Sequence, residues 1–428
     1  MKIIKSIIAL CVATALAVTI IACRTKDELL VSFEGEEIHA GLYLAISVSV
    51  KMSANSKIDE ALSPSSDASS QATSSTVDYS KQKVEEKDYY TWIKDETVKR
   101  CKQYLYIEKE FNRLELSLTA EQKTAIENQS VNSWNNTTNE YGQEQAGAGS
   151  IYSKNGVALK SWQLLMENSY KSQLIFESIY AADGTSPIPE ADLKKALSEN
   201  YMLVNAVTHV TTVHDHDETS SDDSATKDMD EAQKKALKDR FDKYAERINK
   251  GEDFAKIYEE EEAFQKKEEE EHNAEHGEGV SSVAPSSAPS SVAPSSEPSS
   301  ELSSAASAAS DTSSGATSSE APKPKDETAV LLSNTDKDSN GVSPYYEKFK
   351  DCAVGSTLVI EDEGIMYLIK RIDPLADPYY YDTKLNTLMY LLKGDEFEKT
   401  TDDAADKIEP VFNDSAVAYY NAKRIDLN

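Results

Sequence analysis

Five of the six histidines in the chain lie in or near acidic segments, and their spacing could support metal chemistry. They are His209, His214, His216, His272 and His276. One residue separates His214 from His216, a spacing that suits zinc or nickel. A surface metal-binding protein could use such a loop, but nothing resembles the closed ligand set of a structural site. We therefore predict no metal site and keep His214 and His216 as candidates for an alternative, zinc-binding function.

Other kinds of chemistry find less support in the sequence. No CxxC spacing occurs, so neither a redox motif nor a zinc ribbon is indicated. No Ser-His-Asp arrangement, phosphate-binding loop or pair of carboxylates stands out, and we predict no cofactor. Cys101 and Cys352 could form a disulfide or remain two buried thiols, and the sequence leaves both open.

The first 22 residues have the pattern of an export signal. Lys2 and Lys5 precede an apolar run that ends shortly before Cys23. The run is shorter than the roughly 20 residues of a transmembrane helix. Its last four residues, Ile-Ile-Ala-Cys, resemble the bacterial lipobox, in which the cysteine is acylated. We predict a lipoprotein anchored through Cys23 to the extracytoplasmic face of the cell membrane. The alternative is an ordinary signal or an uncleaved anchor with an incidental cysteine.

Charge and length limit the classes of function. The formal net charge is −30 over 428 residues, which allows two or three domains. Such acidity argues against nucleic acid and anionic lipid as partners.

Two stretches have too few large apolar residues to form a core. Ser53 to Ser80 is rich in serine, alanine and aspartate, and Gly277 to Lys325 repeats Ser-Ser-Val-Ala-Pro and similar units. Burial in such segments cannot offset the entropy of ordering them, so we expect flexible linkers. Glu259 to Glu271 is nearly all glutamate and lysine, and a charged spacer is favoured there over a solvated helix.

Hydrophobic periodicity predicts helices through most of the first half of the chain. A short strand, a turn at Gly35 and either a second strand or the start of a helix open it. Helices are expected over Gly41–Met52, Tyr89–Leu116, Thr119–Trp134, Gly156–Tyr180 and Pro189–Asn200. Thr119 and Gln122 form a capping-box pattern at the start of the third of these.

The second half mixes strands with helices. Tyr201 to Val213 is rich in β-branched residues and predicts a strand. Asp362 to Gly364 separates two strands of a hairpin. Helices are predicted over Met229–Lys250, from Asp253 onward, over Phe349–Ala353, and over Thr383–Lys393 and Lys399–Ile408. Val411 to Ile425 predicts a strand or an irregular segment.

Three stretches resemble the exported parvulin-type chaperones, the SurA and PrsA lipoprotein foldases. Val31 to Gly41 is similar to the opening "V-x-x-N-G-x-x-I" of that family's N-terminal domain. Tyr201 to Ala255 resembles the start of the parvulin domain, and Phe349 to Arg371 its close. The resemblance implies an α+β fold: a mainly helical SurA-like N-terminal domain completed by C-terminal segments, and a degenerate parvulin-like α/β domain interrupted by a disordered insertion.

The domain boundaries that follow are these: a signal peptide over 1–22, the start of the SurA-like domain over 23–52, a disordered Ser-rich insertion over 53–85, a helical chaperone domain over 86–200, the first part of the parvulin-like domain over 201–262, a charged and disordered insertion over 263–327, the second part of the parvulin-like domain over 328–372, and a C-terminal segment packing on the N-terminal domain over 373–428.

The resemblance also implies where an isomerase site would lie. In the family, two histidines and a cysteine or aspartate form a polar cluster. His209 matches the first histidine, whereas the last-strand histidine is replaced by Tyr367, or by Met366 if the register slips. The Gly-Gly stretch of the middle residue is reduced to Asn340-Gly341. His209 and Tyr367 are thus the candidate catalytic residues of an incomplete site.

We therefore expect an extracytoplasmic lipoprotein chaperone with weak or no peptidyl-prolyl isomerase activity. Its expected partners are unfolded secreted proteins, together with the membrane through Cys23. An active parvulin-type isomerase and a zinc-binding surface lipoprotein are the alternatives.

Overall fold

The computed structural model describes residues 27–62, 77–138, 144–214, 226–276, 323–326, 328–334 and 343–427. These residues form two compact units. Unit one holds the described residues up to Ile188 and from Leu392 on, and unit two holds the described residues between Pro189 and Leu391. The signal, Cys23, His216 and the linker over 277–322 lie outside the described residues. Helices and small antiparallel sheets occur in both units, which confirms the α+β class.

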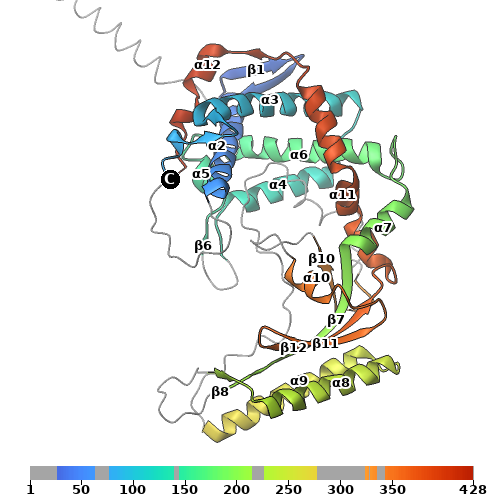
Figure 1. Cartoon of the computed structure of the whole chain (residues 1–428). Helices are drawn as coiled ribbons and strands as arrows, with labels where there is room; N and C mark the ends of the chain where they lie inside the picture. Colours follow the sequence, from blue (N-terminus) through green and yellow to red (C-terminus); the bar gives the residue numbers. More distant parts are fainter. Residues whose placement is uncertain are drawn as a thin grey trace, which may run out of the picture. The chain divides into compact units, whose positions relative to one another are not determined.

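The two ends of the described chain meet in one small sheet of unit one (Figure 1). Strand β1 (Leu29–Phe33) pairs antiparallel with β2 (Glu36–His39) and with β13 (Val411–Phe412). Gly35 closes the β1–β2 turn with a φ of 100°, a left-handed conformation that glycine adopts without strain. The predicted strand and turn are therefore confirmed, the element after the turn is a strand, and residues nearly 400 positions apart share one sheet.

Helices make up the rest of unit one. They are α2 (Ala40–Leu62), α3 (Tyr89–Arg113), α4 (Ala120–Trp134), α5 (Gly149–Tyr152), α6 (Leu159–Tyr180), the part of α11 (Pro378–Ala405) from Leu392 on, and α12 (Asp414–Tyr419). The unit also contains the short strand pairs β3 (Lys83–Val84)–β4 (Lys87–Asp88) and β5 (Thr137–Thr138)–β6 (Glu144–Gln145), and the turns η1 (Tyr79–Lys81) and η3 (Ala422–Arg424). Helix α6 packs against α2, α3 and α4. The predicted capping box is present, because Thr119 Oγ1 accepts from Gln122 N and Gln122 Oε1 accepts from Thr119 N.

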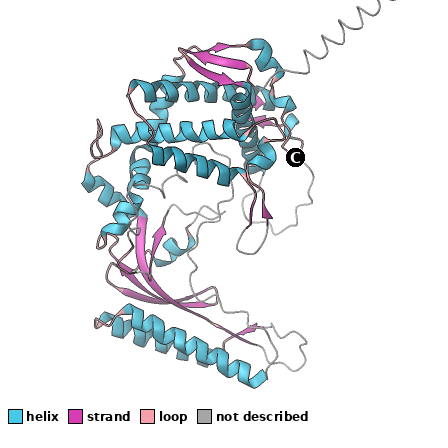
Figure 2. Cartoon of the chain, turned by 180° about the vertical axis from the view of Figure 1, so that it is seen from behind, coloured by secondary structure: helices cyan, strands magenta, loops and turns pink. Residues whose placement is uncertain are grey.

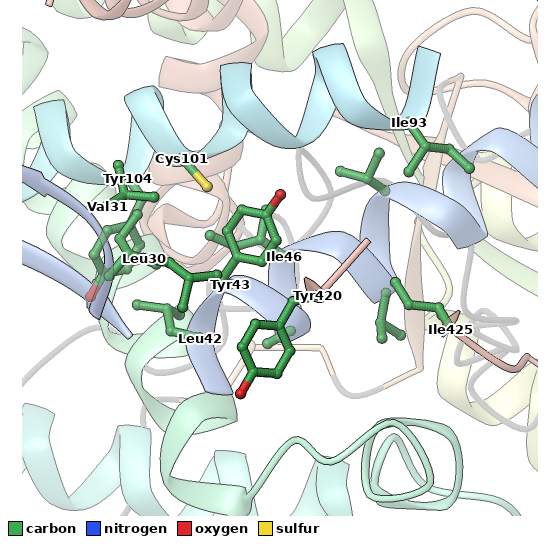
Figure 3. Close-up of a cluster of buried hydrophobic side chains, with 14 of the residues drawn as sticks. Leu30, Val31, Leu42, Tyr43, Ile46, Ile93, Cys101, Tyr104, Tyr420 and Ile425 are labelled. Atoms are coloured by element: carbon green, nitrogen blue, oxygen red, sulfur yellow. The ribbon is translucent and has the colours of Figure 1, made fainter. Parts of the chain in front are cut away.

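The core of unit one lies between α2 and α3 and is completed from the C-terminal end (Figure 3). Tyr43 and Ile46 of α2 face Cys101 of α3, and Tyr420 and Ile425 belong to the same cluster. Lys51 of α2 donates to the backbone oxygen of Ile425 at 2.5 Å. The C-terminal segment is therefore part of the core and not an appended tail.

Unit two is built on an antiparallel sheet with the strand order β10-β7-β12-β11. The strands are β7 (Tyr201–Val210), β10 (Ala329–Ser333), β11 (Thr357–Asp362) and β12 (Ile365–Ile372), and β8 (Thr212–His214) pairs separately with β9 (Thr226–Asp228). Its helices are α7 (Glu190–Asn200), α8 (Glu231–Asn249), α9 (Phe254–His276), α10 (Pro344–Phe349) and the first part of α11 (Pro378–Ala405). Helices α8 and α9 run along one face of the sheet (Figures 1 and 2).

Two stretches expected to be without structure are helical in part, and those predictions were wrong there. Helix α2 passes the expected boundary at Met52 and ends at Leu62, because Ala54 and Ile58 continue its buried face. The charged run Glu259–Glu271 belongs to α9 and is not a spacer, since its Glu261 contacts His209 of the sheet and its Phe264 packs on Arg240 of α8. Residues 63–76 lie outside the described part of the chain.

Several element boundaries also differ from the prediction. One continuous helix, α11, replaces the two expected around Gly394, since one glycine costs a helix only about 1 kcal/mol. Helix α10 comes earlier than the helix predicted over Phe349–Ala353, and the predicted strand from Tyr201 breaks at Thr211. Helix α7 belongs to unit two, and the expected boundary at residue 373 moves to Leu392, within α11.

Candidate functional site

Side chains of β7 alternate between the two faces of the sheet in unit two. Val207 packs in the cluster with α8 and α9, and His209 lies on the same face. We call this the helix-covered face. Met202 and Val204 pack on the opposite side with Phe349 of α10, and we call that the α10 face. The two faces hold different polar groups, and each candidate residue belongs to one of them.

His209 is buried in an ionic cluster on the helix-covered face. Its Nδ1 lies 2.7 Å from Oε1 of Glu261 in α9, and Arg240 of α8 donates to the same oxygen at 2.9 Å. On its other side, His209 Nε2 lies 3.4 Å from an oxygen of the half-exposed Glu268. A carboxylate on Nδ1 fixes the orientation of an imidazole, so Glu261 determines how His209 points.

The cluster leaves two buried polar atoms without a partner. Glu261 Oε2 and Arg240 Nε form no hydrogen bond within the described residues. Buried polar atoms are normally paired, because an unmade hydrogen bond costs the full desolvation of the group. The arrangement therefore stabilises the unit less than a complete network would.

Phe264 brings an apolar surface to the same cluster. The guanidinium of Arg240 lies 3.5 Å from the centre of its ring, at stacking distance for a cation on an aromatic face. The ring also meets His209 edge-on at 6.4 Å. Burial raises the pKa of the Glu268 carboxyl, and nearby Glu261 and Glu271 add to this, although His209 and Arg240 act in the opposite direction.

The α10 face carries a second polar group inside apolar surroundings. Lys348 Nζ lies 2.5 Å from Asp362 and 4.8 Å from the centre of the Tyr367 ring. Burial alone lowers the pKa of Lys348, but Asp362 and Tyr367 more than offset it, and the net shift is upward. Burial raises the pKa of the Tyr367 phenol. Tyr367 therefore carries its proton and Lys348 its charge at neutral pH.

The structure does not bring the two candidate catalytic residues together. His209 lies on the helix-covered face and Tyr367 on the α10 face. The register pairs Met366, not Tyr367, with His209 across the two central strands. The residue opposite His209 therefore carries a thioether, which has no proton to share.

The residues that do contact His209 were missed from the sequence. Glu261 lies among eight glutamates between residues 259 and 271, and nothing in that run marks one of them as buried. Phe264 was the available signal, because it is the only aromatic residue of the run. An aromatic side chain inside a charged segment indicates a helix with one buried side.

The residues of the metal and disulfide alternatives lie partly inside and partly outside the described ranges. His214 ends β8, but its side chain lies outside the description, as does all of His216. Within the described ranges, no group of three or more His, Cys, Asp or Glu side chains could hold a metal ion. Cys101 and Cys352 are both buried free thiols. None of the described helices combines the length and apolarity needed to cross a membrane.

Comparisons with known proteins add no family to this geometry. No family model matches the chain. No curated protein and no solved structure matches it either.

Proposed function

We propose that this protein is an extracytoplasmic, lipid-anchored chaperone of the SurA/PrsA type that binds unfolded secreted proteins and has weak or no prolyl isomerase activity. The observation that carries the proposal is the separation of His209 and Tyr367 onto opposite faces of one sheet. Rotation about a peptide bond to proline faces a barrier near 20 kcal/mol. An enzyme lowers it only with groups that favour the twisted amide over both planar forms.

Polar groups on opposite faces of a sheet cannot act on one amide. His209 is also held by Glu261 and Arg240 beneath two helices, so a bound peptide would have to displace those contacts. Without such a cluster, the protein binds the planar and the twisted forms of the prolyl amide equally tightly. Equal binding does not accelerate the rotation.

Incompletely covered apolar surface supports the binding part of the proposal. Leu358, Ile360 and Ile365 of the α10 face are only half-buried, and Tyr345 of α10 is 46% exposed. Apolar surface of this kind binds unfolded chains without demanding one sequence. The strong negative charge of the whole protein keeps such a surface soluble.

Two assays on the purified ectodomain test the proposal. One follows cis-to-trans relaxation of a short peptide containing proline, and the other follows aggregation of a denatured protein. We expect suppression of aggregation and little isomerase activity. His209→Ala and the conservative Tyr367→Phe should leave both readouts nearly unchanged. Strong isomerase activity that His209→Ala abolishes, or no effect on aggregation, would contradict the proposal.

The anchor is tested separately in cells. The lipobox-like Ile20 to Cys23 motivates a Cys23→Ser variant, which cannot be acylated. Metabolic labelling with a fatty acid should mark the wild type and not the variant. Equal labelling of the two proteins would rule out lipidation at Cys23.

A further inference from the structure

Strand β7 is paired along one side for most of its length and along the other side for only half of it. Strand β12 pairs with Leu203–Val210, whereas β10 pairs with Tyr201–Asn205. Among the described strands, none pairs with Ala206–Val210 on the β10 side. We call this half the open edge of β7.

The register shows which backbone groups face the open edge. In an antiparallel ladder, one residue directs both its N–H and its C=O to the same neighbour, and successive residues alternate. Thr211 N donates to Gly364 O at 2.7 Å on the β12 side, and Asn334 N donates to Asn200 O at 2.9 Å on the β10 side. Odd-numbered residues of β7 therefore face β12. Ala206, Thr208 and Val210 face the open edge.

One side chain already occupies part of that edge. Gln265 of α9 donates from its amide nitrogen to the Thr208 carbonyl at 2.8 Å. The carboxamide thus makes the contact that a backbone N–H of an added strand would make. Thr208 is exposed, and Val210 is 57% exposed, so the edge is accessible beyond this contact. Edge strands usually carry lysine, proline or a bulge that blocks pairing, and Ala206–Val210 has none of these.

The charge beside the open edge is negative. Glu262 and Glu269 lie one turn to either side of Gln265 on the same side of α9, and Glu262 is exposed while Glu269 is half-buried. The run over residues 259–271 holds eight glutamates against two lysines. Side chains of a strand added at the open edge would alternate between α9 and the α10 face. The side chains that point toward α9 would meet carboxylates, and those that point toward the α10 face would meet apolar side chains.

We propose that the open edge of β7 binds an extended segment of an unfolded chain as an added strand, and that it favours segments in which basic and β-branched residues alternate. The unpaired backbone groups of β7 require an extended segment, and the glutamates of α9 favour basic residues in that segment. The inference rests on the proposed function in one respect, since it takes an unfolded chain as the partner.

Labelled heptapeptides test the inference on the complete ectodomain by fluorescence anisotropy at low salt. We expect binding of a peptide that alternates lysine and valine, and none of the matching glutamate–valine peptide. A peptide of the same composition with blocks of lysine and valine should bind about tenfold more weakly. Equal binding of the alternating and block peptides would show that charge alone is recognised, and would overturn the proposal.

Backbone methylation of the peptide tests strand addition without altering the protein. Methyl groups on alternate peptide nitrogens give two peptide variants. One has lost the N–H groups that would point toward β7, and the other has lost the N–H groups that would point toward solvent. One variant should lose binding about tenfold or more, and the other should bind like the parent. Equal tolerance of both methylation patterns would exclude an added strand.

Two protein variants locate the site. Thr208→Pro removes an N–H that points to the open edge and takes no part in the β12 ladder. We expect it to weaken binding about tenfold, whereas the control Thr208→Val keeps the N–H and should bind normally. The double variant Glu262→Lys with Glu269→Lys should reverse the preference toward the glutamate peptide. An unchanged preference would contradict the charge argument.

The aggregation assay separates this inference from the proposed function. If Thr208→Pro loses the peptide and also suppresses aggregation less, both stand. If no peptide binds the wild type while aggregation is fully suppressed, the open edge is not the client site and only this inference fails. If the wild type does not suppress aggregation, the proposed function fails on its own readout.

Discussion

The two units of this protein differ in how completely they satisfy their own surfaces. In unit one, strands from both ends of the described chain pair with each other, and side chains from the C-terminal segment complete the core. In unit two, the central strand keeps an open edge, and the α10 face is only half covered. Unit one therefore has its core completed from both ends of the described chain, whereas unit two leaves half of one central strand unpaired among the described strands.

The buried glutamate of each unit shows the same difference. In unit one, the two oxygens of Glu108 accept from Lys171 at 2.6 Å and from Asn168 at 2.8 Å. In unit two, Glu261 uses one oxygen for both of its partners and leaves the other without one. Complete pairing fixes α3 to α6 in a single arrangement, whereas incomplete pairing holds α9 less firmly to the sheet.

The largest expected effect separates the two units by truncation. Ending the chain after Asp406 removes β13, α12 and the buried Ile408, Tyr420 and Ile425. At about 1.5–3 kcal/mol for each large side chain, the loss approaches the whole stability of a typical domain. Hydrogen exchange should show α2 and α3 unprotected, with β7 and β12 still protected. Unchanged protection of α2 and α3 would show that the C-terminal segment is dispensable.

A smaller effect is expected when the buried carboxylate of unit one is removed. Glu108→Ala leaves Lys171 with Glu167 as its remaining carboxylate, 3.0 Å away. We expect a loss of about 3 kcal/mol, the low end for breaking a buried ion pair, because Lys171 keeps that partner. Denaturant unfolding measures it. The matched control Glu167→Ala removes a more exposed partner and should cost about 1 kcal/mol or less.

The corresponding change in unit two should cost less. Glu261→Ala removes a carboxylate that is only half paired, and we expect a loss of about 1–2 kcal/mol. A double-mutant cycle with His209→Ala should give a coupling energy of about 1 kcal/mol, because the two side chains share one short contact. A loss equal to that of Glu108→Ala would remove the distinction between the two clusters.

Local signals in the sequence were sufficient for most elements but not for the site. Thr119 and Gln122 placed a helix start correctly, and Gly251, with a φ of 96°, follows α8 at the point where the helix predicted over Met229–Lys250 ends. The partners of His209 could not be predicted, because Glu261 is 52 residues away and belongs to a run of similar residues. Whether His209 and Tyr367 share a face depends on the register between β7 and β12, and only pairing across the sheet determines it.

The smallest expected effect concerns the point where β10 stops and the open edge begins. Asp326 accepts from the Thr328 hydroxyl at 2.6 Å and from Thr328 N at 3.0 Å, and the side-chain amide of Asn205 donates to it at 2.9 Å. Burial raises the pKa of Asp326, but these hydrogen bonds outweigh it and hold the pKa below its ordinary value of 3.8.

A carboxyl whose pKa is depressed by folding stabilises the protein above its ordinary pKa, and this contribution is lost as pH falls through the folded value. Unit two should therefore lose stability as the pH falls below 3.8, by about 1 kcal/mol or less because Asp326 is partly exposed. Asp326→Asn keeps an acceptor for Thr328 and should flatten the acid limb of the unfolding curve. Identical acid limbs for the two proteins would show that the charge of Asp326 does not hold the start of β10. The open edge of β7 would then need another explanation for where it begins.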